Sequence, residues 1–268
     1  MPEGDSYARA AARVRAVLSG QRIDRLAGSA AAARRWSGRI IEARVTEVRS
    51  RGKRLLIRLD TGITISAHLG MNGRVRVGRG FREPGSESLL LQTSQHHVVF
   101  DAARIEAGRD AVIEAGLGRL GPDLLDPNFS PSSTRAGSFP HYRTVSELLL
   151  DQRVMAGVGN VFKNEILFLE KVNPATPVGL LTDGQIEALI ERARRLLVAN
   201  ATRAVRTTTG LPGPGGRNWV YGRAGLPCRR CRQAIVKEMI GQPARVTFWC
   251  PGCQPGPSAT PSAWNRSL

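Results

Sequence analysis

The residues best suited to chemistry stand at the start of the chain, in Met1-Pro2-Glu3-Gly4. An initiator Met before a small residue is usually removed, and its removal here would leave Pro2 with a free secondary amine. An α-amino group titrates at about pH 7.7–8.0, against about 10.4 for a lysine side chain. A fraction of this amine is therefore uncharged at neutral pH and can form a Schiff base with an electrophilic carbon. Glu3 lies beside it as an acid or base. The alternative is that Pro2 only starts a helix.

The four cysteines form a second candidate site. Cys228 and Cys231 make one C-x2-C pair, and Cys250 and Cys253 make another after eighteen intervening residues. Two such pairs joined by a hairpin can surround one Zn²⁺ tetrahedrally, whereas redox dithiols or two disulfides are the competing interpretations. Four protein ligands leave no open position on the metal. We therefore expect one structural Zn²⁺ that folds a finger and takes no part in catalysis.

The first half of the chain predicts a helix followed by a sheet structure. Apolar residues recur with helical spacing over residues 4–19, and this helix would hold the N-terminal amine on a packed element. Alternating patterns and short turns then suggest an antiparallel β-sandwich. A basic turn at residues 50–54 contains Lys53, and a solvated charged loop is the plainer interpretation of it. The predicted strands lie at residues 41–45, 55–59, 63–67, 74–77 and 98–100.

The second half predicts helices and a hairpin. A helix at 145–150, a turn ending in Gly157-Val158-Gly159-Asn160 and a helix at 161–171 would present backbone N–H groups at a helix N-terminus, a geometry that binds phosphate. An ordinary helical corner has the same pattern. Thr182 and Gln185 fit a capping box that opens a helix reaching about residue 205. The hairpin strands between the cysteine pairs are predicted at 234–236 and 246–249.

The charge favours a nucleic-acid partner. The net charge is +17 and is spread along the chain, which indicates a folded basic surface. Nearly all of it is arginine, which suits bidentate phosphate contacts, although a GC-rich genome would also favour arginine codons. No apolar run is long enough to span a membrane, so we expect no membrane partner and a cytoplasmic protein. The few lysines are Lys53, Lys163, Lys171 and Lys237.

These motifs occur in an order that resembles the formamidopyrimidine-DNA glycosylase and endonuclease VIII family, over about residues 1–254. The resemblance is carried by the Pro-Glu-Gly start, Arg51-Gly52-Lys53, His68-Leu69-Gly70-Met71, Gly157-Val158-Gly159-Asn160 and the two cysteine pairs. With Gly4 after Pro2-Glu3, the start of the chain resembles that of the endonuclease VIII branch. The start of the chain and the run 219–225 resemble the actinobacterial members of that branch.

The resemblance implies an α+β fold with an N-terminal helix, an antiparallel β-sandwich, and a helix–two-turn–helix domain with a C-terminal β-hairpin zinc finger. The active site would lie in the cleft between the two domains. The expected divisions are a catalytic domain at 1–121, a linker at 122–140, the helical domain at 141–215, the finger at 216–254 and a disordered tail at 255–268.

The resemblance also implies roles for single residues. Pro2 would attack the sugar C1′ of a flipped, damaged nucleotide and expel the base, with Glu3 transferring protons. Lys53 would lie near the phosphate and assist β-elimination. Arg245 matches the family's finger arginine, which is associated with phosphate binding and the second elimination. Three further residues would contact DNA: His68 and Asn160 at phosphates, and Met71 as an apolar wedge, for which core packing is the alternative.

Two departures from the family pattern bear on the substrate. Ser6 stands where many members carry a second glutamate, and Asp5 is the candidate to compensate. Residues 101–105 stand near the place of a loop that enters the helix opposite the lesion in the formamidopyrimidine branch, but they lack its phenylalanine. A bubble or single-stranded substrate is therefore an alternative to damaged duplex DNA.

The expected function is a monomeric, bifunctional DNA glycosylase and AP lyase of base-excision repair at the bacterial nucleoid. It would remove mainly oxidised pyrimidines and cleave the strand by β- or β,δ-elimination. One alternative is a family member that binds damaged DNA without catalysis, which Ser6 favours. Another is a zinc-ribbon protein associated with RNA or the ribosome, which leaves Pro2, Glu3 and Lys53 unexplained.

Overall fold

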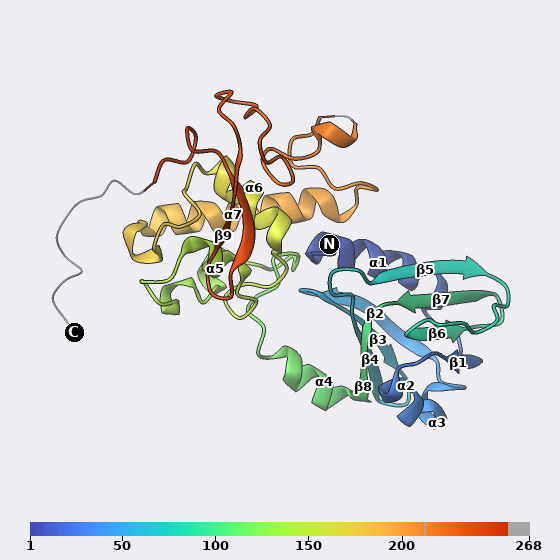
Figure 1. Ribbon diagram of the computed structural model, residues 1–268. Coiled ribbons are helices and arrows are strands. Elements are labelled where there is room, and N and C mark those ends of the chain that lie inside the picture. The colour runs from blue at the N-terminus through green and yellow to red at the C-terminus, as the bar shows by residue number, and fades with distance from the viewer. Residues whose placement is uncertain (212, 257–268) are drawn as a thin grey trace. The chain divides into compact units, whose positions relative to one another are not determined.

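The computed structural model describes residues 1–211 and 213–256, and it divides into two compact units (Figure 1). Unit 1 comprises residues 1–137, 151–159 and 194–205, and unit 2 comprises 138–150, 160–193 and the described chain from 206 onward. The domain boundaries expected from the sequence remain predictions. Of the expected disordered tail, residues 257–268 lie outside the described part of the chain.

Unit 1 is a sandwich of two four-stranded antiparallel sheets, as the sequence predicts. One sheet has the strand order β1-β6-β7-β5, and the other has the order β2-β3-β4-β8. The first contains β1 (Arg25–Ala27), β5 (Arg74–Arg79), β6 (Leu89–Gln92) and β7 (His96–Asp101); the second contains β2 (Val45–Arg51), β3 (Arg54–Leu59), β4 (Ile63–His68) and β8 (Arg104–Arg109).

The core of unit 1 follows from the sequence patterns. Helix α1 (Gly4–Leu18) confirms the predicted helix and buries Tyr7, Val14 and Leu18 on one face. That face packs with buried strand residues such as Ile57 and Phe100 in one apolar cluster. The predicted hairpin is confirmed, because β3 and β4 pair across residues 60–62. The other helices of this unit are α2 (Ala31–Arg35), α3 (Ser37–Ile40) and α4 (Asp110–Leu117).

The strand predicted at residues 41–45 is wrong. Glu42 has a φ of 67°, and its N–H donates to the Ile23 carbonyl at 2.8 Å. The chain therefore turns tightly after α3, and β2 begins only at Val45. The alternation of apolar and polar residues here reflects a turn with Ile40 and Ala43 buried on its inner side.

Unit 2 contains helices and the predicted finger hairpin. Helix α7 (Asp183–Ala201) runs from unit 2 into unit 1 at Arg194, and it ends four residues before the predicted end at 205. Its capping box is confirmed, since the Thr182 N–H donates to Gln185 Oε1 at 2.9 Å. The remaining regular elements are α5 (Val145–Leu150), α6 (Asn160–Leu169), β9 (Val236–Ile240), β10 (Arg245–Trp249) and short 3-10 turns at Pro131–Ser133, Ala136–Ser138, Val178–Leu180 and Pro214–Gly216.

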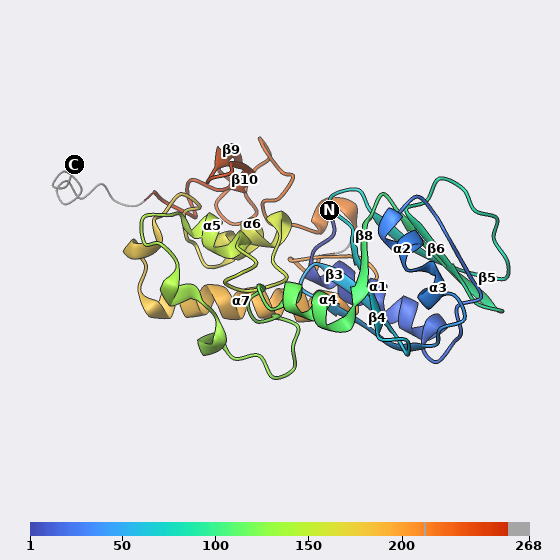
Figure 2. The same cartoon turned by 90° about the horizontal axis from the view of Figure 1, so that it is seen from below.

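The hairpin and the loop before it are fastened to α6. Strands β9 and β10 pair antiparallel, and β10 lies against α6 (Figure 2). The first hairpin strand occupies 236–240 and so begins where the predicted strand at 234–236 was expected to end. The buried carboxylate of Glu165 on α6 accepts the N–H groups of Trp219, Val220 and Tyr221 at 2.7, 2.9 and 2.8 Å. Among the described residues, no helix combines the length and apolar composition needed to cross a membrane.

Candidate active site and metal centre

The start of α1 is fastened to a turn that lies far away in the sequence. The Glu3 side chain is fully buried, and the Gly159 N–H donates to Glu3 Oε2 at 3.0 Å. The Gly4 N–H donates to the Gly157 carbonyl at 2.9 Å. These two hydrogen bonds fix both the orientation of the Glu3 carboxylate and the point at which the chain leads back to Pro2.

The glycines are required at this contact. A Cβ on Gly159 would lie 2.4 Å from Cδ of Glu3, and a Cβ on Gly4 would lie 3.0 Å from Cα of Gly157. Only a residue without a side chain lets the two backbones approach so closely. The Gly-Val-Gly motif, interpreted from the sequence as part of a phosphate site, thus also holds Glu3 in place. The contact between this motif and Glu3 could not be identified from local spacing in the sequence.

The turn that carries Lys53 packs on the same segment of chain. Gly52 has a φ of 55° between β2 and β3, and its N–H donates to Asp123 Oδ2 at 2.7 Å. A Cβ on Gly52 would lie 3.0 Å from Cβ of Ala156. Because Ala156 belongs to the segment 151–159 that holds Glu3, the Lys53 turn and the chain start share one support within unit 1.

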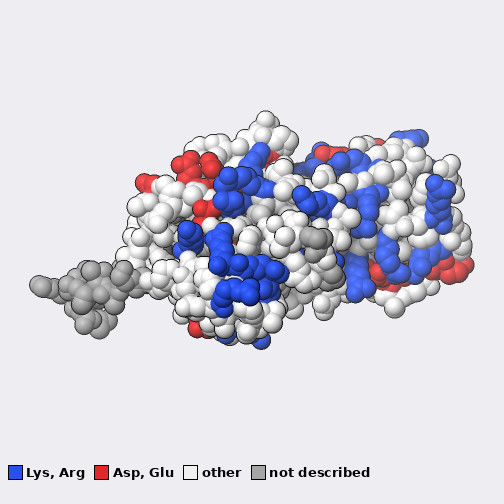
Figure 3. All heavy atoms as spheres, turned by 90° about the horizontal axis from the view of Figure 1, so that it is seen from above, with Lys and Arg blue, Asp and Glu red and all other residues white. Residues whose placement is uncertain are grey.

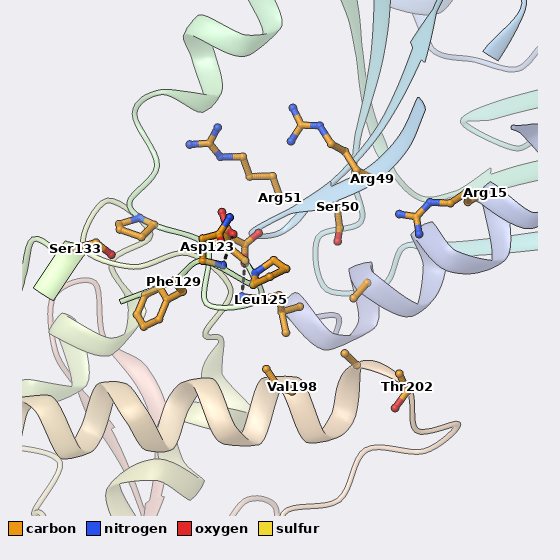
Figure 4. Close-up of a pocket in the computed structure, with 16 residues that line it drawn as sticks. Arg15, Arg49, Ser50, Arg51, Asp123, Leu125, Phe129, Ser133, Val198 and Thr202 are labelled. Atoms are coloured by element: carbon orange, nitrogen blue, oxygen red, sulfur yellow. Dashed lines mark hydrogen bonds between the residues drawn. The ribbon is translucent and has the colours of Figure 1, made fainter. Parts of the chain in front are cut away.

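Asp123 is a positioning residue that the sequence did not reveal. Its carboxylate accepts the Gly52 N–H and, through Oδ1, the Leu125 N–H at 2.9 Å. Burial raises the pKa of this carboxyl. Figure 4 shows Asp123 beside Leu125 and near Arg51, at the edge of a cavity of about 730 Å³. Lys53 and the other predicted catalytic residues are not in the wall of this cavity, so we assign it no catalytic role.

A second cavity in unit 1, of about 410 Å³, adjoins Pro2. Ser6, Met71 and Asn72 are in its wall together with Pro2. Met71 has 69% of its surface exposed, which contradicts the alternative that it packs in the core. The full lining is Met1, Pro2, Ser6, Met71, Asn72, Gly73 and Arg74.

Helix α1 also positions the turn that carries Met71. The Tyr7 hydroxyl accepts the Leu69 N–H at 2.7 Å, and burial raises the pKa of Tyr7 to about 12. Asp5, the candidate to compensate for Ser6, is fully buried and ion-paired with Arg9 at 3.0 Å. Its carboxylate is therefore committed within the helix, and Ser6 is the polar residue of α1 that reaches the cavity.

Basic residues gather around His68 at one end of the second sheet. His68 pairs in register with Arg104 across β4 and β8. Burial lowers the pKa of His68, and the positive charges of Arg54, Arg104 and Lys53 lower it further. Arg54 belongs to the basic turn at residues 50–54, but neither it nor Arg104 was singled out from the sequence, since single arginines give no signal in so basic a chain. Strands β7 and β8 are joined by Ala102 and Ala103 alone, so residues 101–105 form no long loop.

The other predicted DNA contacts lie in unit 2. Asn160 begins α6, and its side-chain Nδ2 donates to the Val246 carbonyl at 2.8 Å. An amide nitrogen carries two hydrogens, and this hydrogen bond uses one of them. The phosphate contact of Asn160 stays a prediction. Arg245 is exposed and is the first residue of β10. Pro2, Glu3, Lys53, His68 and Met71 belong to unit 1.

The four cysteines are brought together as predicted, and their arrangement fits a metal. Their Sγ atoms all lie within 4.8 Å of one another, with Cys228 to Cys253 at 3.8 Å and Cys231 to Cys250 at 3.3 Å. A tetrahedral Zn²⁺ with Zn–S bonds of about 2.3 Å would hold its sulfurs about 3.8 Å apart. All four thiols are free of disulfides.

Comparisons with known proteins agree with this architecture. A family model described as the formamidopyrimidine-DNA glycosylase N-terminal domain matches residues 1–109, and one described as the formamidopyrimidine-DNA glycosylase H2TH domain matches residues 120–210. The chain belongs to the formamidopyrimidine-DNA glycosylase family. The resemblance seen in the sequence is thereby confirmed.

Relatives of the endonuclease VIII branch span nearly the whole chain. The "DNA-(apurinic or apyrimidinic site) lyase Nei2" of Mycolicibacterium smegmatis is 40% identical, covering 95% of this chain and 99% of that protein. The "Endonuclease 8 2" of Mycobacterium tuberculosis is 38% identical, with 95% and 100% covered. The predicted similarity to the endonuclease VIII branch is also confirmed.

Solved structures of this family share the fold. A complex between the Lactococcus lactis enzyme Fpg and DNA containing an abasic site has a TM-score of 0.79 and 22% identity, covering 95% of this chain and 100% of that one. The same enzyme with DNA containing an N7-benzyl-Fapy-dG lesion gives a TM-score of 0.81 at 22% identity, with the same coverage. The predicted α+β fold is confirmed.

The basic environment of His68 predicts that this side chain is protonated only at a lower pH than an ordinary histidine. In DNA-free protein, His68 should titrate below about 6.5, the usual value for histidine, and so should be neutral at pH 7. Arg104→Ala should raise its pKa by removing a nearby positive charge. Arg109→Ala, at the far end of the same strand, should not. NMR titration of the histidine ring protons measures the pKa of His68 in the wild type and in both variants. Equal effects of the two arginine variants would contradict a specific influence of Arg104 on His68.

The cysteine cluster predicts that the finger depends on metal. The purified protein should contain one Zn²⁺ per chain, and a chelator should unfold the hairpin while the sandwich of unit 1 keeps its structure. Cys250→Ser should have the same effect, because binding of structural zinc contributes on the order of 10 kcal/mol to folding such fingers. Metal analysis and circular dichroism test this. Added Zn²⁺ should restore the chelated wild type but not the variant; a zinc-free protein with an intact hairpin would contradict it.

Proposed function

We propose that this protein is a bifunctional DNA glycosylase and AP lyase of base-excision repair. The observation that carries the proposal is that one segment of the chain contacts both Glu3 and the turn that carries Lys53. The segment 151–159 holds the buried Glu3 carboxylate through Gly159 and packs against Gly52, the residue before Lys53. The nucleophile, the proton carrier and the lysine would thus be positioned by one segment of the chain, and catalysis depends on such positioning.

The proposed first step is displacement of the damaged base. After removal of Met1, the Pro2 nitrogen attacks C1′ of the flipped nucleotide, and the bond from C1′ to the base breaks with its electron pair moving to the base. The base leaves with a proton, and Glu3 would transfer this proton. Opening of the sugar ring then gives an iminium linkage between Pro2 and C1′.

The proposed second step cleaves the strand. Loss of a proton from C2′ of the iminium intermediate expels the 3′ phosphate, which is β-elimination. Lys53 would lie at that phosphate, within the basic cluster formed with Arg54, His68 and Arg104. Loss of the 5′ phosphate in a δ-elimination would be assisted by Arg245, whose exposed position on β10 leaves it accessible to DNA. Water finally releases the sugar remnant from Pro2.

DNA is the partner that the charge and the relatives support. The Lactococcus lactis structures contain damaged DNA, and the net charge here is +17. Figure 3 shows Lys and Arg side chains exposed in both units on the face drawn. We propose damaged duplex DNA as the main substrate. The short connection between β7 and β8 also favours a bubble or a single strand, because it offers no loop to fill the space opposite the lesion.

Oxidised pyrimidines are the proposed lesions. The resemblance to the endonuclease VIII branch, which acts mainly on oxidised pyrimidines, supports this preference. Ser6 and Asn72 line the cavity beside Pro2 with neutral polar side chains, and the Ser6 hydroxyl also contacts Asp5 and Arg9. Action as a monomer at the bacterial nucleoid completes the proposal.

The test is a substrate survey under single-turnover conditions. Matched oligonucleotides should carry thymine glycol, 8-oxoguanine, an abasic site or no damage, each as duplex, bubble and single strand. We expect base release and strand cleavage with thymine glycol and the abasic site, and slower reaction with 8-oxoguanine. Tight binding to damaged DNA without any product would favour the non-catalytic alternative instead. Stronger binding to structured RNA than to abasic DNA would favour the RNA-associated alternative.

A further inference from the structure

Three side chains on one face of α6 hold three successive residues of β10. Asn160 Nδ2 donates to the Val246 carbonyl at 2.8 Å, and Lys163 Nζ donates to Thr247 Oγ1 at 2.7 Å. The Phe248 N–H donates to Asn164 Oδ1 at 2.7 Å. Positions i, i+3 and i+4 lie on one face of a helix, so the three side chains can follow the strand in register.

This contact is unusually polar for a buried one. Lys163, Asn164 and Thr247 are all fully buried. A buried ammonium or amide group is strongly unfavourable unless it is hydrogen-bonded. In the described hairpin, β10 pairs with β9 on one side only, and Val246 and Phe248 use their outward backbone groups to meet α6. The helix side chains therefore take the place of a third strand and fix the register of β10.

The hairpin turn is fastened as well. The Gln242 N–H donates to Glu147 Oε1 at 3.0 Å, and an Arg143 guanidinium nitrogen donates to the Gln242 carbonyl at 2.8 Å. Glu147 lies in the first turn of α5, and Arg143 lies two residues before that helix. Arg245 thus lies between two attached points, Gln242 on one side and Val246 on the other.

We propose that Asn164, Lys163 and Glu147 are positioning residues that place Arg245 for the second elimination. This inference rests on the proposed function. Because the exposed guanidinium has to meet a DNA phosphate at a defined place, a displacement of about 1 Å would slow the step that uses it by up to about 10²-fold. The first elimination, which depends on the residues of unit 1, would be little changed.

The experiment follows both eliminations on one DNA substrate. Wild type and variants react with a duplex carrying an abasic site, and gel electrophoresis separates the β product from the β,δ product. Asn164→Ala should slow the second elimination by roughly 10- to 100-fold and leave borohydride trapping of the first intermediate within about twofold. Asn164→Asp keeps an acceptor for the Phe248 N–H and should recover part of the loss. Lys237→Ala is the control, because Lys237 is the exposed β9 partner of Phe248 and touches the same hairpin without α6.

A double-mutant cycle makes the test specific. If Asn164 acts through Arg245, Asn164→Ala should have little further effect in an Arg245→Ala background. Glu147→Gln should act in the same direction as Asn164→Ala, which keeps the test valid if one variant folds poorly; zinc content monitors the finger. Equal loss of trapping and second elimination, additive effects in the cycle, or a wild type that stops after the first elimination would overturn the proposal. Absence of any trapped intermediate in the wild type would instead overturn the proposed function.

Discussion

Strand cleavage at an abasic site should fall on the order of 10³-fold or more when the Pro2 amine is blocked. An N-terminal extension that keeps Met1-Pro2 in an ordinary peptide chain removes the amine and changes no side chain. The expected loss is large because an amide nitrogen cannot form an iminium with C1′, and no other group of the chain is proposed to take over this attack. Single-turnover cleavage of abasic duplex DNA measures it.

The matched control is the same extension followed by a protease site that leaves Pro2 as the first residue. Mass spectrometry confirms the two N-termini. Cleavage should restore activity in full, while DNA affinity should be similar in both forms. An extended protein that cleaves abasic DNA as fast as the trimmed one would contradict the role of Pro2.

Gly159→Ala should reduce base removal by about 10²-fold or more. The added Cβ would lie 2.4 Å from Cδ of Glu3, so either the carboxylate or the 157–159 turn must move. Movement would also remove the hydrogen bond that orients Glu3 Oε2. Since the contact is fully buried, no solvent-exposed rearrangement can absorb the change. Single-turnover release of an oxidised pyrimidine measures the effect.

Gly184→Ala supplies the control for this prediction. Gly184 lies in the first turn of α7 with open space around it, so alanine should be tolerated and should favour the helix slightly. Thermal unfolding of both variants separates misfolding from misplacement. A Gly159→Ala enzyme with wild-type activity would show that the Glu3 carboxylate needs no fixed position, and would contradict its proposed role in proton transfer.

Local patterns predicted the elements that carry strong periodic signals. Helix α1, the β3–β4 hairpin and the capping box at Thr182 follow from spacing and turn residues within a few positions. The cysteine cluster was predictable because two C-x2-C pairs at this spacing are a common zinc-ligand pattern. Short strands such as β1 and β8 were missed, since three to six residues in a basic, glycine-rich stretch give no clear alternation.

The candidate site depended on contacts that no local pattern contains. Gly159 meets Glu3 across more than 150 positions, and Asp123 meets Gly52 across about 70. The sequence places these glycines in short motifs and this aspartate in the expected linker, and it shows none of their contacts. The segment 151–159 likewise belongs to unit 1 although helices of unit 2 flank it on both sides. Such partners become visible only when the chain is folded.

The position of the covalent link to DNA identifies the nucleophile. The trimmed protein is incubated with duplex DNA carrying an abasic site, the intermediate is reduced with borohydride, and the digested conjugate is sequenced by mass spectrometry. We expect a sugar remnant on the Pro2 nitrogen, with none on Lys53. A remnant on Lys53, or no conjugate from a protein that binds this DNA tightly, would contradict it.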